Sequence, residues 1–123
     1  MNYALLIYQA EELAERRSEA ETEQMLQEHR ELQERSKSAG AFVLAEELMP
    51  SHAATTVRSR AGKVSIMDGP FAETKEQFIG LYVVSCKDLD EAIEYAKLIP
   101  DVRTGSIEVR PIAYHEVGET SDA

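Results

Sequence analysis

The sequence comprises 123 residues, 43% of them hydrophobic, and its 23 acidic against 13 basic residues give a formal net charge of −10. This length suits one domain with a core large enough to fold without metal or disulfide staples. The acidic balance disfavours nucleic acid and membrane surfaces as partners, because phosphate groups repel an acidic surface. Cys86 is the only cysteine, which excludes an intramolecular disulfide and fits the cytoplasm. The first residues lack a basic leader and a long apolar core, so we expect neither a signal peptide nor a membrane span.

Apolar patterning predicts six strands along the chain. They are expected at residues 3–9, 41–48, 54–60, 63–67, 77–86 and 106–114. The dipeptide Ala61-Gly62 is a tight turn, so the third and fourth strands form a hairpin. We assign residues 1–117 to one domain and residues 118–123 to a polar tail.

Two helices are predicted between these strands. The first spans about residues 19–39, with Met25, Leu26, His29 and Leu32 on one face. Residues 11–17, which precede it, are either a separate short helix or a loop. The second spans residues 88–99, begins at the N-cap Asp88 and stops at a proline.

With the hairpin set aside, the elements form two strand–helix–strand halves. This order predicts an α+β fold of the ferredoxin-like, split βαβ type, in which both helices cover one face of a four-stranded antiparallel sheet. Residues 3–8 and 78–84 are apolar on both faces of their strands, so the second sheet face needs a cover. We therefore expect a homodimer in which two sheets pack face to face as a dimeric α+β barrel.

Residues 68–75, with the sequence DGPFAETK, are the most distinctive stretch. The Gly-Pro pair imposes a turn, and Asp68 caps that turn through its side chain. The first interpretation is therefore structural, but a turn requires neither Glu73 nor Lys75. In the second interpretation the loop lines a pocket, because functional groups concentrate on loops held by rigid scaffolds. That pocket would be formed by His29, Arg58, Asp68, Phe71, Glu73 and Lys75.

The chain resembles the YCII-related family in its DGPF branch. The similar stretches are residues 3–8, 54–58, 68–76 (DGPFAETKE), 80–84, 88–94 and 107–112. The resemblance implies a ferredoxin-like dimeric α+β barrel. It also implies a His/Asp pair at the barrel cleft, for which an enzymatic role has been proposed in the wider family, and a link of some members to regulatory sigma factors. It directs attention to His29, because the family tends to carry a histidine on the first helix.

The histidines have different expected environments. His29 shares a helix face with Met25 and Leu32, so its imidazole points at the sheet or the cleft and could move a proton near neutral pH. The alternative is a histidine at the core edge with one hydrogen-bond partner. His52 and His115 are expected on the surface. Their spacing predicts no metal site, and no phosphate loop or dinucleotide fingerprint is present, so we expect no cofactor.

Three functions remain open at this point. The first is a dimer whose cleft binds a small polar or anionic molecule between His29, Arg58 and the DGPF loop, with Phe71, Glu73 and Lys75 as the ligand-binding residues of that loop. The second is a hydrolase or lyase at the same cleft, with His29 as general base and Asp68 as the carboxylate that orients it. The third, suggested by the resemblance alone, is an interaction module that works with sigma-factor machinery through its acidic surface.

Overall fold

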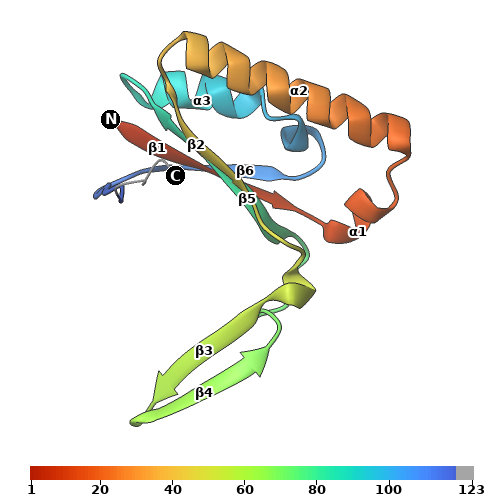
Figure 1. Ribbon diagram of the computed structural model, residues 1–123, viewed down its shortest axis with the longest axis vertical. Coiled ribbons are helices and arrows are strands. Elements are labelled where there is room, and N and C mark those ends of the chain that lie inside the picture. Colours follow the sequence, from red (N-terminus) through yellow and green to blue (C-terminus); the bar gives the residue numbers. More distant parts are fainter. Residues whose placement is uncertain (119–123) are drawn as a thin grey trace, which may run out of the picture.

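The computed structural model describes residues 1–118, and its main body is a four-stranded antiparallel sheet. The strands are β1 (Asn2–Gln9), β2 (Phe42–Glu47), β5 (Gln77–Ser85) and β6 (Ser106–Pro111), in the spatial order β2-β5-β1-β6. β1 lies at the centre and pairs with both β5 and β6. This is the strand order of the split βαβ arrangement, so the expected α+β architecture is confirmed at the level of the sheet (Figure 1).

Three helices and two short 3-10 turns complete the body. They are α1 (Glu11–Glu15), α2 (Glu19–Ser38), η1 (Ser51–Ala53), α3 (Leu89–Lys97) and η2 (Pro100–Arg103). Residues 11–17, for which the sequence allowed either a short helix or a loop, thus contain the short helix α1. α2 starts at a full capping box, in which the Ser18 hydroxyl accepts the Glu21 N–H at 3.1 Å and the Glu21 carboxylate accepts the Ser18 N–H at 3.3 Å. The predicted N-cap of the second helix is also correct, since the Asp88 side chain accepts the Glu91 N–H at 3.0 Å.

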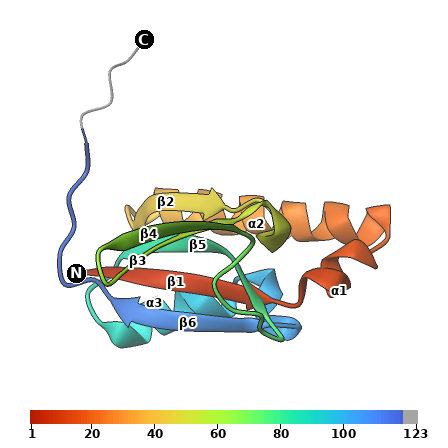
Figure 2. The same ribbon diagram turned by 90° about the horizontal axis from the view of Figure 1, so that it is seen from below.

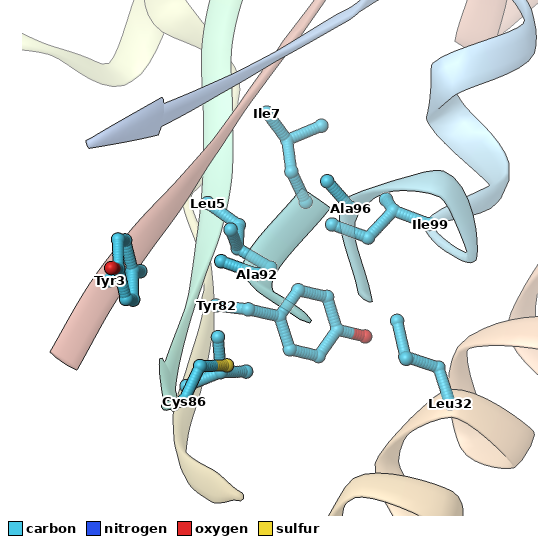
Figure 3. Packing of buried hydrophobic residues seen from close by; sticks show 10 residues of the cluster. Tyr3, Leu5, Ile7, Leu32, Tyr82, Cys86, Ala92, Ala96 and Ile99 are labelled. Carbon is cyan, nitrogen blue, oxygen red and sulfur yellow. The ribbon is translucent and has the colours of Figure 1, made fainter. Parts of the chain in front are cut away.

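The core fills the space between the sheet and the helices α2 and α3, which lie on the same side of it (Figure 1). Alternate residues of β1 point into this space, because successive strand side chains face opposite ways. The buried cluster contains Tyr3, Leu5, Ile7, Leu32, Tyr82, Val84, Cys86, Ala92, Ala96 and Ile99. Figure 3 shows Tyr82 reaching across this core from β5, with its hydroxyl directed toward the helix that carries Leu32.

The opposite face of the sheet is partly open. Leu6 of β1 pairs with Leu81 of β5, and Tyr8 pairs with Phe78, so these four side chains share the face that points away from the helices. Phe78 is 40% exposed. Residues 1–118 of one chain form no closed barrel. The dimeric barrel expected from the sequence therefore stays a prediction.

The predicted hairpin is a separate two-stranded sheet of β3 (Thr55–Arg60) and β4 (Lys63–Asp68). It projects from the side of the main sheet opposite the helices (Figures 1 and 2). Its turn residues Ala61 and Gly62 both have positive φ, at 51° and 77°, as a tight hairpin turn requires. Within residues 1–118, no hydrogen bond or ion pair joins β3 or β4 to the four-stranded sheet.

Two predicted ends differ from the observed ones. The last strand ends at Pro111 and not at residue 114, because Pro111 pairs with Tyr3 and β1 provides no further strand partner beyond Asn2. The second helix ends at Lys97, so that Ile99 packs into the core from the connection to η2. Most of the predicted polar tail, residues 119–123, lies outside the described residues.

Candidate functional site

His29 is the centre of a hydrogen-bonded chain between α2, β5 and η2. Its Nδ1 lies 2.7 Å from the Tyr82 hydroxyl, and its Nε2 lies 2.9 Å from Oδ1 of Asp101. The imidazole and the Tyr82 ring are stacked, with centroids 5.9 Å apart and planes inclined by 7°. The amide of Gln33, one turn after His29, donates to the same Tyr82 oxygen at 3.3 Å. Four side chains from three elements thus form one connected polar network.

Local structure explains why these groups meet. His29 precedes the buried Leu32 by three residues on α2, and Tyr82 is an inward-facing residue of β5. Asp101 is the second residue of η2, and its carbonyl accepts the Gly105 N–H at 2.8 Å, which folds η2 back toward the sheet. A Cβ at Gly105 would lie 2.1 Å from the carbonyl oxygen of Tyr8, so only glycine permits this close approach.

The donors in the chain follow from the chemistry of its ends. An ionised carboxylate can only accept, so Nε2 carries the proton toward Asp101, and in the neutral ring Nδ1 accepts the Tyr82 O–H. Burial raises the pKa of Tyr82 and so keeps its hydroxyl protonated. The hydrogen bond from Gln33 has a smaller effect in the opposite direction. Asp101 is only 4% exposed, whereas the His29 side chain is 23% exposed. The carboxylate therefore orients a histidine that solvent and ligands still reach.

A cavity of about 500 Å³ opens beside this network. Its polar wall contains His29, Gln33, Tyr82 and Asp101, and its apolar wall contains Met25, Leu26, Ala45, Leu48 and Ile79. The other charged residues on its lining are Glu11, Glu15, Glu46, Glu47 and Arg17, of which Glu46 pairs with Leu81 and directs its side chain to the opposite face of the sheet. Cavities of this size, apolar with a few convergent polar groups, are typical of small-molecule sites.

Glu11 lines the cavity and also holds neighbouring segments together. Its carboxylate accepts the backbone N–H of Ser51 at 2.7 Å and the Ser51 hydroxyl at 2.5 Å. Its own backbone N–H donates to the Gln77 side chain at 2.9 Å. Glu11 therefore ties the start of α1 to the start of β5 and to η1, the turn that precedes the hairpin.

The structure places the DGPF loop elsewhere in the chain. Asp68 ends β4 and is exposed, and Phe71 is 74% exposed. Arg58 reaches the loop, since its guanidinium donates to the Phe71 carbonyl at 3.4 Å. The exposed Glu73 and Lys75 do not line the cavity beside His29, and neither do the other residues expected from this loop. Within one chain, the structure brings Arg58 to the loop but brings neither of them to His29.

The carboxylate in contact with His29 is Asp101 and not Asp68. Both ring nitrogens of His29 are engaged, so the histidine also has two partners where the core-edge interpretation expected one. Sequence reasoning missed Asp101 because it follows Pro100, which marked only the end of a helix. Tyr82 gave a weak signal, since it belongs to a strand whose side chains were expected to be buried. No local pattern signals that α2 and η2 pack together.

The described residues give two further findings. Among residues 1–118, no group of three or more His, Cys, Asp or Glu side chains is arranged to hold a metal ion. None of the helices in that part of the chain has both the length and the apolar character that crossing a membrane requires.

Comparison with known proteins agrees with the resemblance noted in the sequence. The family model described as "YCII-related domain" matches residues 1–115. The chain is also 40% identical over 121 residues to a protein of Rhizobium meliloti (strain 1021) that is named only as uncharacterized, and the match covers 97% of this chain and 98% of that protein. The DGPF branch is a finer assignment that these matches leave as a prediction. The chain belongs to the YCII-related family.

Proposed function

We propose that the chain is an enzyme that moves a proton on a small polar molecule bound in the cavity beside His29. The observation that carries this proposal is the chain of hydrogen bonds from Gln33 through Tyr82 and His29 to Asp101 at the cavity wall. A histidine oriented by a buried carboxylate is a common general base. Hydrolysis and lyase-type elimination are the reaction classes that such a base serves.

The network offers a defined route for the proton. The Tyr82 oxygen donates to Nδ1 of His29 and accepts from Gln33, which leaves it one further lone pair for an O–H or N–H of a ligand. When Nδ1 of His29 takes up a proton, its bond to Tyr82 reverses and the Tyr82 O–H is free to donate to the ligand. Asp101 stabilises the resulting imidazolium through Nε2. Base and acid steps could thus alternate without movement of the backbone.

The charges on the lining restrict the ligand. Glu11, Glu15 and Glu47 line the cavity against one arginine, Arg17, so an uncharged or cationic molecule is favoured over an anion within one chain. This differs from the cleft expected around Arg58 and Lys75. Those two cations, with Phe71, Glu73 and Asp68, would join the site only if a second chain presents its loop there.

We also propose that the chain is a homodimer. The support is the partly open sheet face with Leu6, Leu81, Tyr8 and Phe78, which matches the expectation of two sheets packed face to face. Light scattering at micromolar concentration is then expected to give twice the 13.8 kDa chain mass. A mass of one chain would contradict the dimer.

The test of the enzymatic proposal is a thermal-shift screen of small polar metabolites. Wild type is compared with His29→Gln and with the matched control His52→Gln, whose histidine lies in η1 and is exposed. We expect compounds that stabilise the wild type and the control but not His29→Gln. Proton NMR of each such compound in D₂O with the wild type should then show product, or exchange of a carbon-bound proton. Compounds that stabilise all three proteins equally would remove His29 from the site.

A second candidate is a non-enzymatic interaction module linked to sigma-factor machinery. It draws support from the family resemblance and from Phe71, an aromatic side chain 74% exposed on the DGPF loop. Phe71→Ser distinguishes the two candidates. An interaction module loses its partner with this change, whereas the response to ligands at His29 stays the same.

A further inference from the structure

A second cavity, of about 400 Å³, lies between the start of α2 and η2. Arg17 and Met25 line it, and both residues also line the cavity beside His29, so the two cavities adjoin there. Arg17 belongs to the short connection between α1 and α2, which Figure 1 shows at one end of the molecule. A molecule bound at His29 therefore reaches Arg17 when it extends toward the second cavity.

Arg17 is a cation without a partner at this junction. The residue is partly buried, and among residues 1–118 its guanidinium forms no ion pair, although the chain has 23 acidic residues. A guanidinium presents a planar fork of N–H donors that matches the two oxygens of a carboxylate. The Arg17 side chain is thus free to bind a carboxylate that a ligand supplies.

The other charged residues on the second lining already have partners. Arg103 donates to the carboxylate of Glu28 at 2.8 and 3.2 Å, so its charge is compensated inside the chain. The Glu21 carboxylate accepts the Ser18 N–H at 3.3 Å at the start of α2. Of the charged residues that the described part of the chain places on this lining, Arg17 is the one left for a ligand.

The surroundings of Arg17 limit the ligand to one negative charge. Glu11, Glu15 and Glu47 on the adjoining lining repel anions, and one guanidinium compensates only a single carboxylate. A phosphate dianion would keep an uncompensated negative charge beside these glutamates. A monocarboxylate therefore fits this position better than a phosphate does.

From these observations we propose that Arg17 is a carboxylate subsite of the site around His29. The substrate is then a monocarboxylate whose reacting end at His29 is uncharged, with a short aliphatic chain in contact with Met25. Its carboxylate lies where a negative charge is compensated, while the glutamates of the lining still disfavour an anionic reacting end. This inference rests on the proposed function and adds the class of substrate to it.

Two-dimensional amide NMR tests the subsite by titrating the wild type with butanoate at constant ionic strength and, separately, with the neutral butanamide. Butanoate should shift the signals of Arg17, Ala20 and Met25 saturably, whereas butanamide should not. Arg17→Gln should raise the dissociation constant of butanoate at least about tenfold, because charge-assisted hydrogen bonds are lost. The matched control is Arg16→Gln, which changes an exposed arginine on neither lining and should alter the constant by less than about twofold. Propyl phosphate, largely a dianion at about pH 8, should bind more weakly than butanoate.

The subsite is overturned by the absence of a saturable shift at Arg17, by equal binding of butanamide, or by equal losses in Arg17→Gln and Arg16→Gln. Tighter binding of propyl phosphate overturns the choice of a carboxylate. His29→Gln keeps Arg17 and should bind butanoate within about twofold of the wild type, and a larger change would place butanoate at His29 instead.

The same titration separates this inference from the proposed enzyme. Butanoate bound at Arg17, without any compound in the metabolite screen that depends on His29, contradicts the enzyme and leaves the carboxylate subsite standing. Compounds that depend on His29, without butanoate bound at Arg17, contradict the subsite and leave the enzyme standing.

Discussion

The pair of His29 and Asp101 predicts an asymmetric response to mutation. The two side chains share one hydrogen bond of 2.9 Å, but their surroundings differ, because Asp101 is 4% exposed and the His29 side chain is 23% exposed. His29→Ala leaves a buried carboxylate without its partner, a change that costs about 3–5 kcal/mol of unfolding free energy. Asp101→Ala leaves Nε2 of His29 without its partner, but water can reach this ring. The free energy of unfolding should therefore fall by about 1.5–3 kcal/mol, as for the loss of a hydrogen bond to a charged group.

The double variant His29→Ala/Asp101→Ala should lose less unfolding free energy than the sum of the losses in the two single variants. Once either partner is gone, removing the other also removes the unpaired group, so we expect a coupling energy of at least about 1.5 kcal/mol. Asp101→Asn retains an acceptor at Oδ1 and should lose only about 1 kcal/mol.

Urea unfolding followed by circular dichroism, at one fixed chain concentration, measures all of these variants. Glu28→Ala is a suitable control. The ion pair of Glu28 with Arg103, at 2.8 Å, lies at the surface and should contribute much less to stability than the contact of the buried Asp101. Two results would refute the reasoning: additivity of the single losses within about 0.5 kcal/mol, or a larger loss for Asp101→Ala than for His29→Ala.

Three further outcomes are expected. Gly105→Ala places a Cβ 2.1 Å from a β1 carbonyl and should lower the melting temperature by at least about 5 °C, whereas Gly118→Ala, with nothing within 4 Å, should leave it unchanged. Tyr82→Phe should cost about 1–2 kcal/mol and abolish the ligand response, whereas Tyr3→Phe, also buried, should leave that response intact. Burial, with a smaller contribution from Glu91, raises the pKa of Cys86 from 9.0 to about 11. The stability that the protonated thiol of Cys86 contributes is therefore complete below pH 9 and lost as pH rises to about 11, by at most about 3 kcal/mol. A wild-type and a Cys86→Ala protein with parallel pH–stability curves above pH 9 would contradict that assignment.

Much of the fold was predictable because its signals are local. The capping pattern from Asp88 to Glu91, the run of apolar residues in β5 and the turn at Ala61-Gly62 each depend on neighbours in the sequence. The topology then followed from the order of the elements. The helix face that carries His29 was also predictable, since helical spacing alone places it three residues from Leu32.

The site was less predictable because its partners are distant in sequence. Asp101 lies 72 residues from His29, and Tyr82 lies 53 residues from it. A buried aspartate after a proline has no periodic pattern, so only the packing of η2 against α2 reveals it. The DGPF stretch drew attention because it is distinctive, but a distinctive sequence does not specify which surface it contacts. Its placement at the base of the β3–β4 hairpin, away from His29 of the same chain, required the three-dimensional structure.

The position of Glu11 has a thermodynamic consequence. Its carboxylate holds η1, the root of the hairpin, while its side chain also lines the cavity. A bound molecule that displaces this carboxylate would break both hydrogen bonds to Ser51, and a partner that contacts the hairpin would act on the same two bonds. Because linkage is reciprocal, any factor by which association of two chains strengthens ligand binding must equal the factor by which the ligand strengthens association. Ligand affinity measured in dilute solution would then report on assembly as much as on the cavity.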